Sequence, residues 1–182
     1  MTNVLIVHGA GGHGRVVSDA ARLLGWDVME TDVKWRTAPG IDDLCHVAIG
    51  DNETRSNYKN YNLQTIIHPT AYVDSSAEIQ AGVFVGPRGV IHISAKVGRG
   101  AIVNTGAIVE HDCVVGDWVH LSPGCVLCGT VTIGEGAWIG ANATVRDGIS
   151  IAPWAVVGCG AVVTKDIVES GTYVGAPARR IK

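Results

Sequence analysis

The chain has 182 residues, which is enough for one large domain or two small ones. Its formal net charge of −3 gives no sign of affinity for nucleic acid, and no segment approaches the length of an apolar membrane span. Hydrophobic residues make up 47% of the sequence but aromatic residues only 5%, so we expect a core of valine, isoleucine and alanine. A glycine-rich turn follows the N-terminus too soon for a signal peptide, which predicts a cytoplasmic protein.

The first 65 residues predict a small α/β unit. Residues 4–8 are an apolar run typical of a buried strand and are bounded by Gly9. A helical pattern over 15–24 follows and ends at Gly25. Residues 26–30 and 47–50 predict two further strands, with a short helix after Asp51 and Asn52. This order of elements corresponds to roughly half of a Rossmann-type sheet.

The turn between the first strand and the helix has the pattern G-x-G-x-x-G, formed by Gly9, Gly11 and Gly14. Backbone N–H groups at a helix start and the positive end of the helix dipole favour an anion such as a phosphate. The alternative is a tight turn with no ligand, but turn geometry does not explain His13 within the loop. Because the unit is too short for a dinucleotide, it predicts a single nucleotide or a nucleotide-sugar.

A repeat of six residues dominates the rest of the chain. Period six is neither the 3.6 of a helix nor the 2 of a plain strand, and it is typical of a parallel β-solenoid that turns a corner once per hexapeptide. The repeat has no skip, so we expect roughly five coils with no inserted loop. The repeated position is a branched aliphatic at Ile67, Val73, Ile79, Val85, Ile91, Val97, Val103, Val109, Val115, Leu121, Leu127, Ile133, Ile139, Val145, Ile151, Val157 and Val163.

Small side chains recur four residues after each aliphatic, with Val83, Val119, Val131 and Ile149 as exceptions. A large residue on each flat side and a small one near each corner suit a narrow triangular cross-section. The five cysteines are odd in number and are not in metal-binding spacing. Those at the small inward positions are expected to be buried, reduced thiols, namely Cys113 and Cys125.

The turn residues of this solenoid form columns, and one of them carries a histidine between two acids, in the sequence Glu110-His111-Asp112. Three hexapeptides make one coil, so residues eighteen apart stack at a spacing of roughly 4.8 Å. Gly129 is therefore expected above His111, where the missing side chain leaves room for a ligand. A histidine oriented by a carboxylate suits a general base. The alternative is an exposed turn histidine among ordinary polar residues.

Two further histidines accompany it. His120 is predicted on an outward-facing position, where a solvated surface histidine is about as plausible as a ligand contact. His92 has no evident role. A zinc site made of His92, His111 and His120 is disfavoured because the three lie on different columns, and we expect no metal.

Five motifs together resemble the bacterial sugar acetyltransferases of the NeuD/PglD type, over essentially the whole chain. They are Gly9-Ala10-Gly11-Gly12-His13-Gly14, His68-Pro69-Thr70-Ala71, Glu110-His111-Asp112-Cys113, His120-Leu121-Ser122-Pro123-Gly124 and Val174-Gly175-Ala176-Pro177-Ala178-Arg179. The resemblance implies an N-terminal half-Rossmann domain over 1–65 that holds a nucleotide-linked sugar. It implies a left-handed β-helix over 66–182, assembled as a trimer, with acetyl-CoA in the groove between neighbouring subunits.

The family's usual reaction, and so the implied activity, is acetyl-CoA-dependent acetylation of the 4-amino group of a nucleotide-linked deoxyamino sugar. Some relatives are linked to O-acetylation of sialic acid, and transfer to a sugar hydroxyl is one alternative. A non-catalytic binding solenoid is another, which the acid, histidine and glycine of one column disfavour.

The resemblance also assigns residue roles. His111 matches the catalytic base, which assists direct transfer, and Asp112 the acid that raises its basicity. His120, Gly129 and Ala141 match positions that contact acetyl-CoA.

Asn104 and Glu110 match polar residues that line the site. The positions that match contacts to the nucleotide-sugar are Gly11, Gly12, His13, Asp32 and Gly50. Over 33–46 the chain is shorter than these relatives, so the resemblance does not specify the nucleotide or the sugar.

Overall fold

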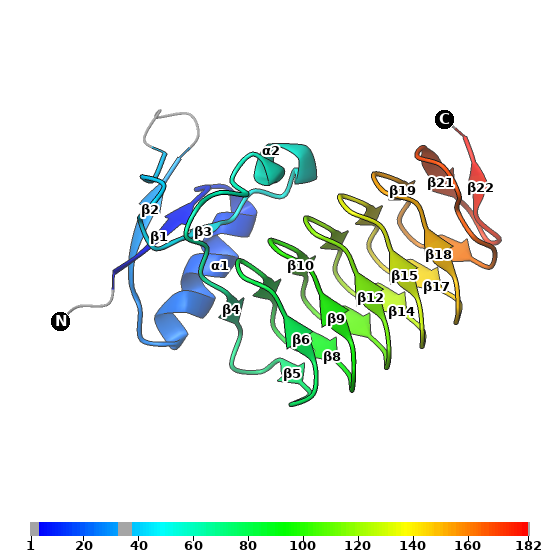
Figure 1. Ribbon diagram of the computed structural model, residues 1–182, viewed down its shortest axis with the longest axis horizontal. Coiled ribbons are helices and arrows are strands. Elements are labelled where there is room, and N and C mark those ends of the chain that lie inside the picture. Colours follow the sequence, from blue (N-terminus) through cyan, green and yellow to red (C-terminus); the bar gives the residue numbers. More distant parts are fainter. Residues whose placement is uncertain (1–3, 33–37, 182) are drawn as a thin grey trace.

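The computed structural model describes residues 4–32 and 38–181, which form a small α/β unit at one end of a long β-solenoid (Figure 1). The N-terminal unit consists of β1 (Val4–His8), α1 (Gly12–Leu23), β2 (Asp27–Thr31), β3 (Cys45–Val47) and α2 (Asn52–Ser56). Its three strands are parallel, in the order β2-β1-β3.

The predicted elements of this unit are present; β2 is shifted by one residue from the predicted 26–30 and α1 ends one residue early, and two bounds differ by more. Helix α1 begins at Gly12, three residues before the predicted start, so its first turn lies inside the glycine-rich loop. The third strand covers Cys45–Val47 rather than the predicted 47–50. The prediction followed the apolar run 47–50 and therefore left out His46, a polar residue that is buried in the strand. His46 Nδ1 donates to the Gln64 carbonyl at 2.8 Å.

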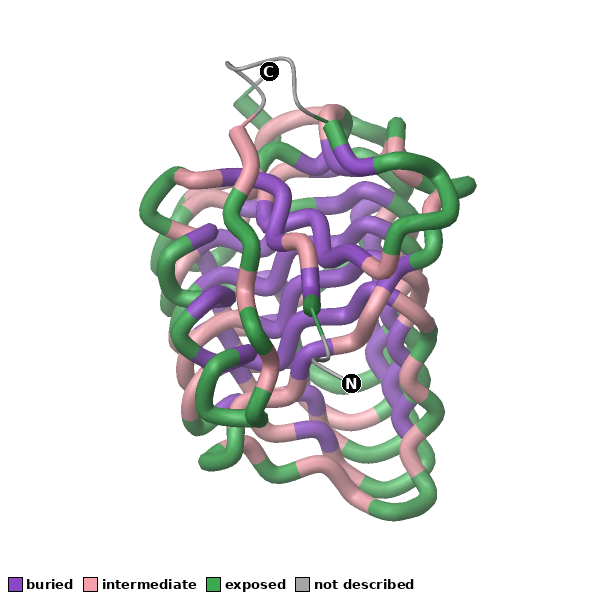
Figure 2. Tube along the Cα trace, turned by 90° about the vertical axis from the view of Figure 1, so that its left-hand side faces the viewer, coloured by how far each residue is buried: buried purple, intermediate pink, exposed green. Residues whose placement is uncertain are grey.

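The solenoid follows the predicted repeat without interruption. Seventeen two-residue strands, β4 to β20, start every six residues from Ile66, which makes five complete coils and two strands of a sixth. Residues eighteen apart pair in register, as the repeat predicted, for example Ile102 with His120. Figure 2 shows buried residues inside the coils and exposed residues at the turns. Cys113 and Cys125 are buried free thiols, as predicted.

The first face of the solenoid, called the β4 face, is covered by the N-terminal unit over its first coils. Its outward residues Ile66, Phe84 and Ile102 share one buried core with Leu5 and Val17 of the N-terminal unit. The strands of this face are β4 (Ile66–Ile67), β7 (Phe84–Val85), β10 (Ile102–Val103), β13 (His120–Leu121), β16 (Trp138–Ile139), β19 (Val156–Val157), β21 (Thr172–Val174) and β22 (Arg179–Arg180).

The second face, called the β5 face, presents a mostly aliphatic column that the chain itself leaves partly or wholly exposed. Its outward residues are Tyr72, Val90, Ile108, Val126, Thr144 and Val162. The strands are β5 (Tyr72–Val73), β8 (Val90–Ile91), β11 (Ile108–Val109), β14 (Val126–Leu127), β17 (Thr144–Val145) and β20 (Val162–Val163).

The third face, called the β6 face, is mostly polar on its outer side. Its exposed side chains include Glu78 and Lys96, which form an ion pair at 3.0 Å, and Thr132. The strands are β6 (Glu78–Ile79), β9 (Lys96–Val97), β12 (Val114–Val115), β15 (Thr132–Ile133) and β18 (Ser150–Ile151).

Helix α2 attaches the N-terminal unit to the corner between the β6 and β4 faces. Arg55 donates to the carbonyls of Gly100 and Trp118, and Asn52 donates to that of Gly136. Successive carbonyls of this set are eighteen residues apart and therefore stack in one column. Two side chains of the short helix α2 thus bridge three coils. No helix in the described part of the chain is long and apolar enough to cross a membrane.

Candidate active site

The predicted site residues of the solenoid lie on two different corners. Glu110, His111 and Gly129 lie on the corner between the β5 and β6 faces, which we call the His111 corner. Asn104 and Ala141 lie on the corner between the β4 and β5 faces. The apolar β5 face separates the two corners, so one chain does not bring all these residues together.

On the His111 corner, the predicted histidine–acid pair is present. His111 Nδ1 donates to Asp112 Oδ2 at 2.9 Å, and both side chains are about half exposed. Asp112 has a φ of 59°, a left-handed conformation that aspartate tolerates better than most residues. Because the carboxylate accepts from Nδ1, the lone pair of His111 is on Nε2, where a proton can be taken from a substrate.

Gly129 stacks above His111 as predicted, but for a different reason. A Cβ built on Gly129 would lie 2.5 Å from both Cε1 and Nε2 of the His111 ring. The bare position therefore makes room for the imidazole itself, and the prediction that it leaves space for a ligand is corrected. On the same corner, Glu110 Oε1 lies 3.7 Å from Nε2 of His92.

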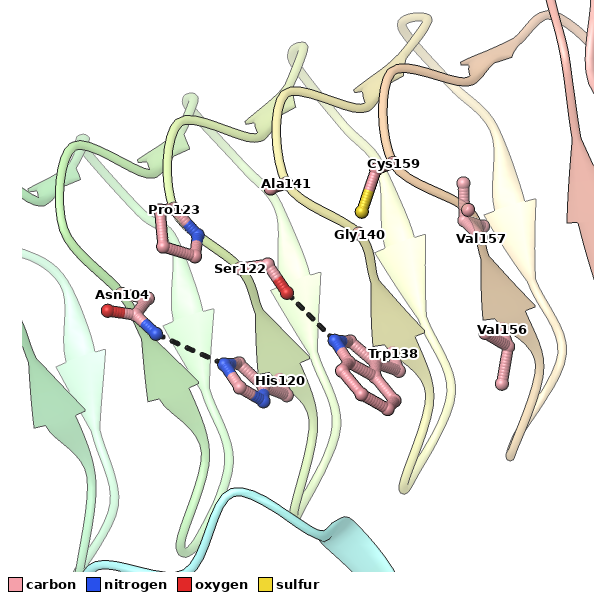
Figure 3. A pocket seen from close by; sticks show the side chains of 11 residues that line it. Asn104, His120, Ser122, Pro123, Trp138, Gly140, Ala141, Val156, Val157 and Cys159 are labelled. Carbon is pink, nitrogen blue, oxygen red and sulfur yellow. Dashed lines mark hydrogen bonds between the residues drawn. The ribbon is translucent and has the colours of Figure 1, made fainter. Parts of the chain in front are cut away.

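The other corner borders a cavity of about 410 Å³ that is largely apolar (Figure 3). Two residues predicted to contact acetyl-CoA, His120 and Ala141, line it, and so does Asn104. The complete lining is Asn104, His120, Ser122, Pro123, Trp138, Gly140, Ala141, Val156, Val157, Gly158 and Cys159.

His120 is a buried wall of this cavity, so the alternative of a solvated surface histidine is wrong; its exposure is 8%. Its ring stacks on Trp138 with centroids 5.7 Å apart and an interplanar angle of 3°. Nε2 lies 3.2 Å from Asn104 Nδ2, and Nδ1 lies 3.3 Å from the Gly50 carbonyl oxygen. Burial, with a smaller effect of the nearby Arg55 charge, lowers the pKa of His120 to about 4, so the ring is neutral.

In the glycine-rich loop, the glycines divide into two kinds. Gly9 has a φ of 124°, and a Cβ on Gly14 would collide with the Gly9 carbonyl, so these two are needed by the turn itself. Gly11 and Gly12 are exposed, and a Cβ added to either would meet no described residue within 4 Å apart from its chain neighbours and the backbone of α1 itself. Packing therefore does not explain Gly11 and Gly12, which leave the start of α1 open to a ligand.

His13 lies in the first turn of α1 and points toward the solenoid. Its ring meets Phe84 edge-on at 5.4 Å and lies 6.3 Å from the ring of His120. Burial is the main cause that lowers its pKa to about 3, and its buried Nε2 has no hydrogen-bond partner in the described part of the chain. The structure thus brings His13, Gly50, His120 and Asn104 together, although they come from both parts of the chain.

Asp32 follows the end of β2, at the same edge of the parallel sheet as the glycine-rich loop. Burial lowers the pKa of His8 at the end of β1, and the Asp32 carboxylate partly opposes that shift. Residues 33–37, the first part of the 33–46 segment that is shorter than in the relatives, lie outside the described residues.

Sequence reasoning missed two residues of this region, His46 and Arg55, both about 1% exposed. His46 was hidden in an apolar run. The spacing Asn52-x-x-Arg55 on a short helix, where residues three apart share a face, was the available signal for Arg55.

Comparison with known proteins gives a consistent family. Residues 130–165 match the model described as bacterial transferase hexapeptide (six repeats). The chain is 33% identical to a variant of perosamine N-acetyltransferase from Caulobacter crescentus, solved in complex with CoA and GDP-perosamine, over 98% of this chain and 96% of that one, with a TM-score of 0.91. This chain belongs to the hexapeptide-repeat family of bacterial sugar acetyltransferases. The predicted family resemblance and the predicted acyltransferase class are confirmed.

Two further structures extend the likeness of this hexapeptide-repeat acetyltransferase. The acetyltransferase domain of PglB from Neisseria gonorrhoeae, in complex with acetyl coenzyme A, is 32% identical over all of both chains, with a TM-score of 0.91. WeeI from Acinetobacter baumannii is 25% identical over 98% of this chain and 99% of that one, with a TM-score of 0.85. Among the described residues, no three His, Cys, Asp or Glu side chains are grouped to hold a metal ion.

Proposed function

We propose that this acetyltransferase transfers the acetyl group of acetyl-CoA to the 4-amino group of a nucleotide-linked deoxyamino sugar. The observation that carries the proposal is the His111–Asp112 pair, 2.9 Å apart, in a chain 33% identical to a perosamine N-acetyltransferase solved with CoA and GDP-perosamine.

The chemistry follows from the free Nε2 of His111. A neutral amine attacks the thioester carbonyl, a C–N bond forms and the C–S bond breaks. His111 takes the proton that the amine loses and passes it to the departing thiolate, so no acyl-enzyme is needed. Asp112 holds the ring with Nε2 unprotonated and stabilises the imidazolium.

The donor and the acceptor have separate places in this proposal. The apolar cavity lined by His120 and Ala141 takes the pantetheine arm of acetyl-CoA, and Gly129 shapes the His111 corner against which the thioester lies. The nucleotide-sugar binds at the open start of α1, with Asn104 and Glu110 near the sugar. Its contacts in the N-terminal unit are Gly11, Gly12, His13, Asp32 and Gly50.

In this proposal a trimer brings the cavity of one subunit next to the His111 corner of its neighbour. The β5 face is the exposed aliphatic face, and it has the cavity at one edge and the His111 corner at the other. In a cyclic trimer built on this face, the His111 corner of one subunit meets the cavity edge of the next. We also propose that 1–65 is a Rossmann-like substrate domain and 66–182 a left-handed β-helix. The parallel order β2-β1-β3 and the glycine-rich turn support the first part.

The test measures CoA release with UDP-, dTDP- and GDP-linked 4-amino sugars and with free sialic acid. Turnover with one amino sugar and not with sialic acid is expected. His111→Ala should lower that turnover by on the order of 10²–10⁴ without weakening acetyl-CoA binding, since a general base contributes this range. The control is His68→Ala, at a partly exposed turn histidine in an earlier coil. Turnover with sialic acid alone, or an unaffected His111→Ala enzyme, would overturn the proposal.

The role of His13 is tested separately. His13→Ala should raise KM for the nucleotide-sugar and leave KM for acetyl-CoA nearly unchanged, because His13 lies in the first turn of α1, next to Gly11 and Gly12, and its Nε2 has no hydrogen-bond partner among the described residues. A fall in kcat with both KM values intact would place His13 in the chemistry instead.

A further inference from the structure

Arg55 is a fully buried cation whose donors are all used. Its Nε donates to the Gly100 carbonyl at 2.8 Å and one Nη2 donor to the Trp118 carbonyl at 2.6 Å. Its Nη1 donates to the carbonyls of Ile49 at 2.8 Å and Gly50 at 3.3 Å, and the second Nη2 donor to Asn52 Oδ1 at 2.9 Å. Nη2 also lies 3.4 Å from the Val119 carbonyl oxygen, so the five N–H groups meet six oxygens, which matches the fixed fork of a guanidinium and exceeds the three donors of lysine.

The described residues place no carboxylate within ion-pair distance of Arg55, and five of the six acceptors are backbone carbonyls. A buried charge is costly unless polar groups of the protein replace the water around it. Backbone carbonyls do this for Arg55 in place of a carboxylate partner. The acceptors fall into two groups. Gly100 and Trp118 belong to the solenoid, whereas Ile49 and Gly50 belong to the loop after β3. Arg55 therefore fixes the position of the Gly50 carbonyl relative to the coils.

From Gly50 a chain of hydrogen bonds leads to the cavity. Asn104 Oδ1 accepts from the Thr105 N–H at 2.8 Å, which orients the amide. Its Nδ2 must then donate to His120 Nε2, so the His120 proton is on Nδ1 and is donated to Gly50. Both nitrogens of His120 are used within the protein. Two side-chain donors in the cavity lining are left for a ligand: the second N–H of the Asn104 amide and the hydroxyl of Ser122, whose oxygen accepts from Trp138 Nε1 at 2.8 Å.

The positive charge of Arg55 also favours the neutral form of the His120 ring. It contributes to the lowered pKa values of three histidines, the half-buried His13 and the buried His46 and His120, after the larger effect of burial. Arg55 itself stays protonated, since burial, partly opposed by Asp51, lowers its pKa only to about 10. If the His120 ring gained a proton, its Nε2 would lose the lone pair that accepts the hydrogen bond from Asn104.

We propose that Arg55 is a positioning residue of the acetyl transfer: through the Gly50 carbonyl and His120 it orients the Asn104 amide toward the acetyl donor or the sugar. This inference rests on the proposed function for what the amide contacts, but the chain of contacts Arg55–Gly50–His120–Asn104 can be tested without turnover.

The first test is the tautomer of His120, read by NMR of the ¹⁵N-imidazole-labelled protein with His120→Gln for assignment. The wild-type protein should show a neutral ring protonated on Nδ1 from pH 6 to 8. Arg55→Lys should shift or broaden the His120 signals, and Arg99→Lys should not. Arg99 is a matched control because it also ties the solenoid to the N-terminal unit, through Tyr61 O at 2.6 Å, but does not contact Gly50. A wild-type ring protonated on Nε2 would overturn the proposal, and this measurement needs no variant of Arg55.

The second test is a double-mutant cycle on kcat/KM. Arg55→Lys should lower kcat/KM by about tenfold, while Arg99→Lys should change it by less than about twofold. In the Asn104→Ala background the same Arg55→Lys change should cost less than about threefold, because a residue that acts through Asn104 has nothing left to orient. Equal losses in both backgrounds, or equal effects of Arg55→Lys and Arg99→Lys, would show a structural role only. Wild-type inactivity on every amino sugar would instead count against the proposed function and leave the tautomer result standing.

Discussion

At the scale of single residues, position on the coil decides what an imidazole can do. His111 is half exposed and has a carboxylate on Nδ1, so its Nε2 can gain a proton from a substrate. His120 is nine residues further on but is buried, and burial lowers its pKa to about 4. One histidine is therefore suited to proton transfer and the other to forming a neutral wall.

The contact between Gly129 and His111 makes a prediction about this geometry. Gly129→Ala should displace the His111 ring, since the new Cβ would lie 2.5 Å from it, and should lower kcat by about tenfold or more. The control is Gly160→Asn, because Gly160 has a φ of 66° with open space around it and Asn142 occupies the same turn position one coil earlier. Steady-state kinetics of both variants decide the matter. An unchanged kcat for Gly129→Ala would mean that the position of His111 is unimportant.

At the scale of elements, the solenoid could be predicted from its repeat, whereas the junction between the solenoid and the N-terminal unit could not be predicted. Each hexapeptide buries one aliphatic side chain, so the sequence alone predicts every strand from β4 to β20. The junction depends on Arg55 and His46, whose burial no local pattern indicates, because their partners are backbone carbonyls far along the chain. For the same reason the pairing of His111 with Asp112, one residue apart, was predictable, and the contact of His120 with Gly50 was not.

Two tryptophans at equivalent turn positions test the junction. Trp118 packs over Gly100 and is 3% exposed beneath the N-terminal unit, whereas Trp154 packs over Gly136 and is 40% exposed. Trp118→Ala should lower the free energy of unfolding by about 3–5 kcal/mol, as for other buried aromatics, and Trp154→Ala by about 1 kcal/mol. Urea unfolding of the two variants at equal subunit concentration measures the difference. Similar losses would mean that the N-terminal unit does not cover Trp118.

The buried histidines of the junction predict a loss of stability in acid. The pKa values of His13, His46 and His120 are lowered to about 3, 4 and 4, mainly by burial. Below the unfolded pKa of about 6.5, the unfolded chain binds protons that the folded chain excludes. Stability is therefore fully present above that pH and falls below it, and these three histidines contribute a slope that approaches three protons, or ~4 kcal/mol per pH unit.

The slope can be measured by urea unfolding between pH 7 and pH 5. His46→Asn, which keeps a donor for the Gln64 carbonyl, should reduce it by about one proton. His68→Asn, at an exposed turn, is the control and should leave it unchanged. A stability that rises as the pH falls, or a slope equal in both variants, would contradict the assignment of neutral buried rings.

At the scale of the whole molecule, the three faces of the solenoid have different surroundings. The N-terminal unit covers the first coils of the β4 face, and the β6 face is mostly polar. The β5 face remains as an aliphatic surface between the two halves of the candidate site. Val126→Arg in this face should prevent assembly, and Thr132→Arg in the β6 face should not. Sedimentation should give three times the 19.0 kDa chain mass for the wild type and the Thr132 variant.

A shared site has a sharper consequence when subunits are mixed. His111→Ala removes the proposed base and Asn104→Ala removes the amide at the other edge of the β5 face, so each variant alone should be nearly inactive. If the two edges come from neighbouring subunits, mixed trimers formed by refolding equal amounts together contain sites in which both residues are intact. Random assembly makes one interface in four of this kind, so about a quarter of wild-type activity should return. A mixture of His111→Ala with Asp112→Asn, two changes on the same corner, is the control and should recover nothing. No recovery in the first mixture would mean that His111 and Asn104 act in the same subunit. That result would contradict the shared site, because the β5 face separates the two residues within one chain.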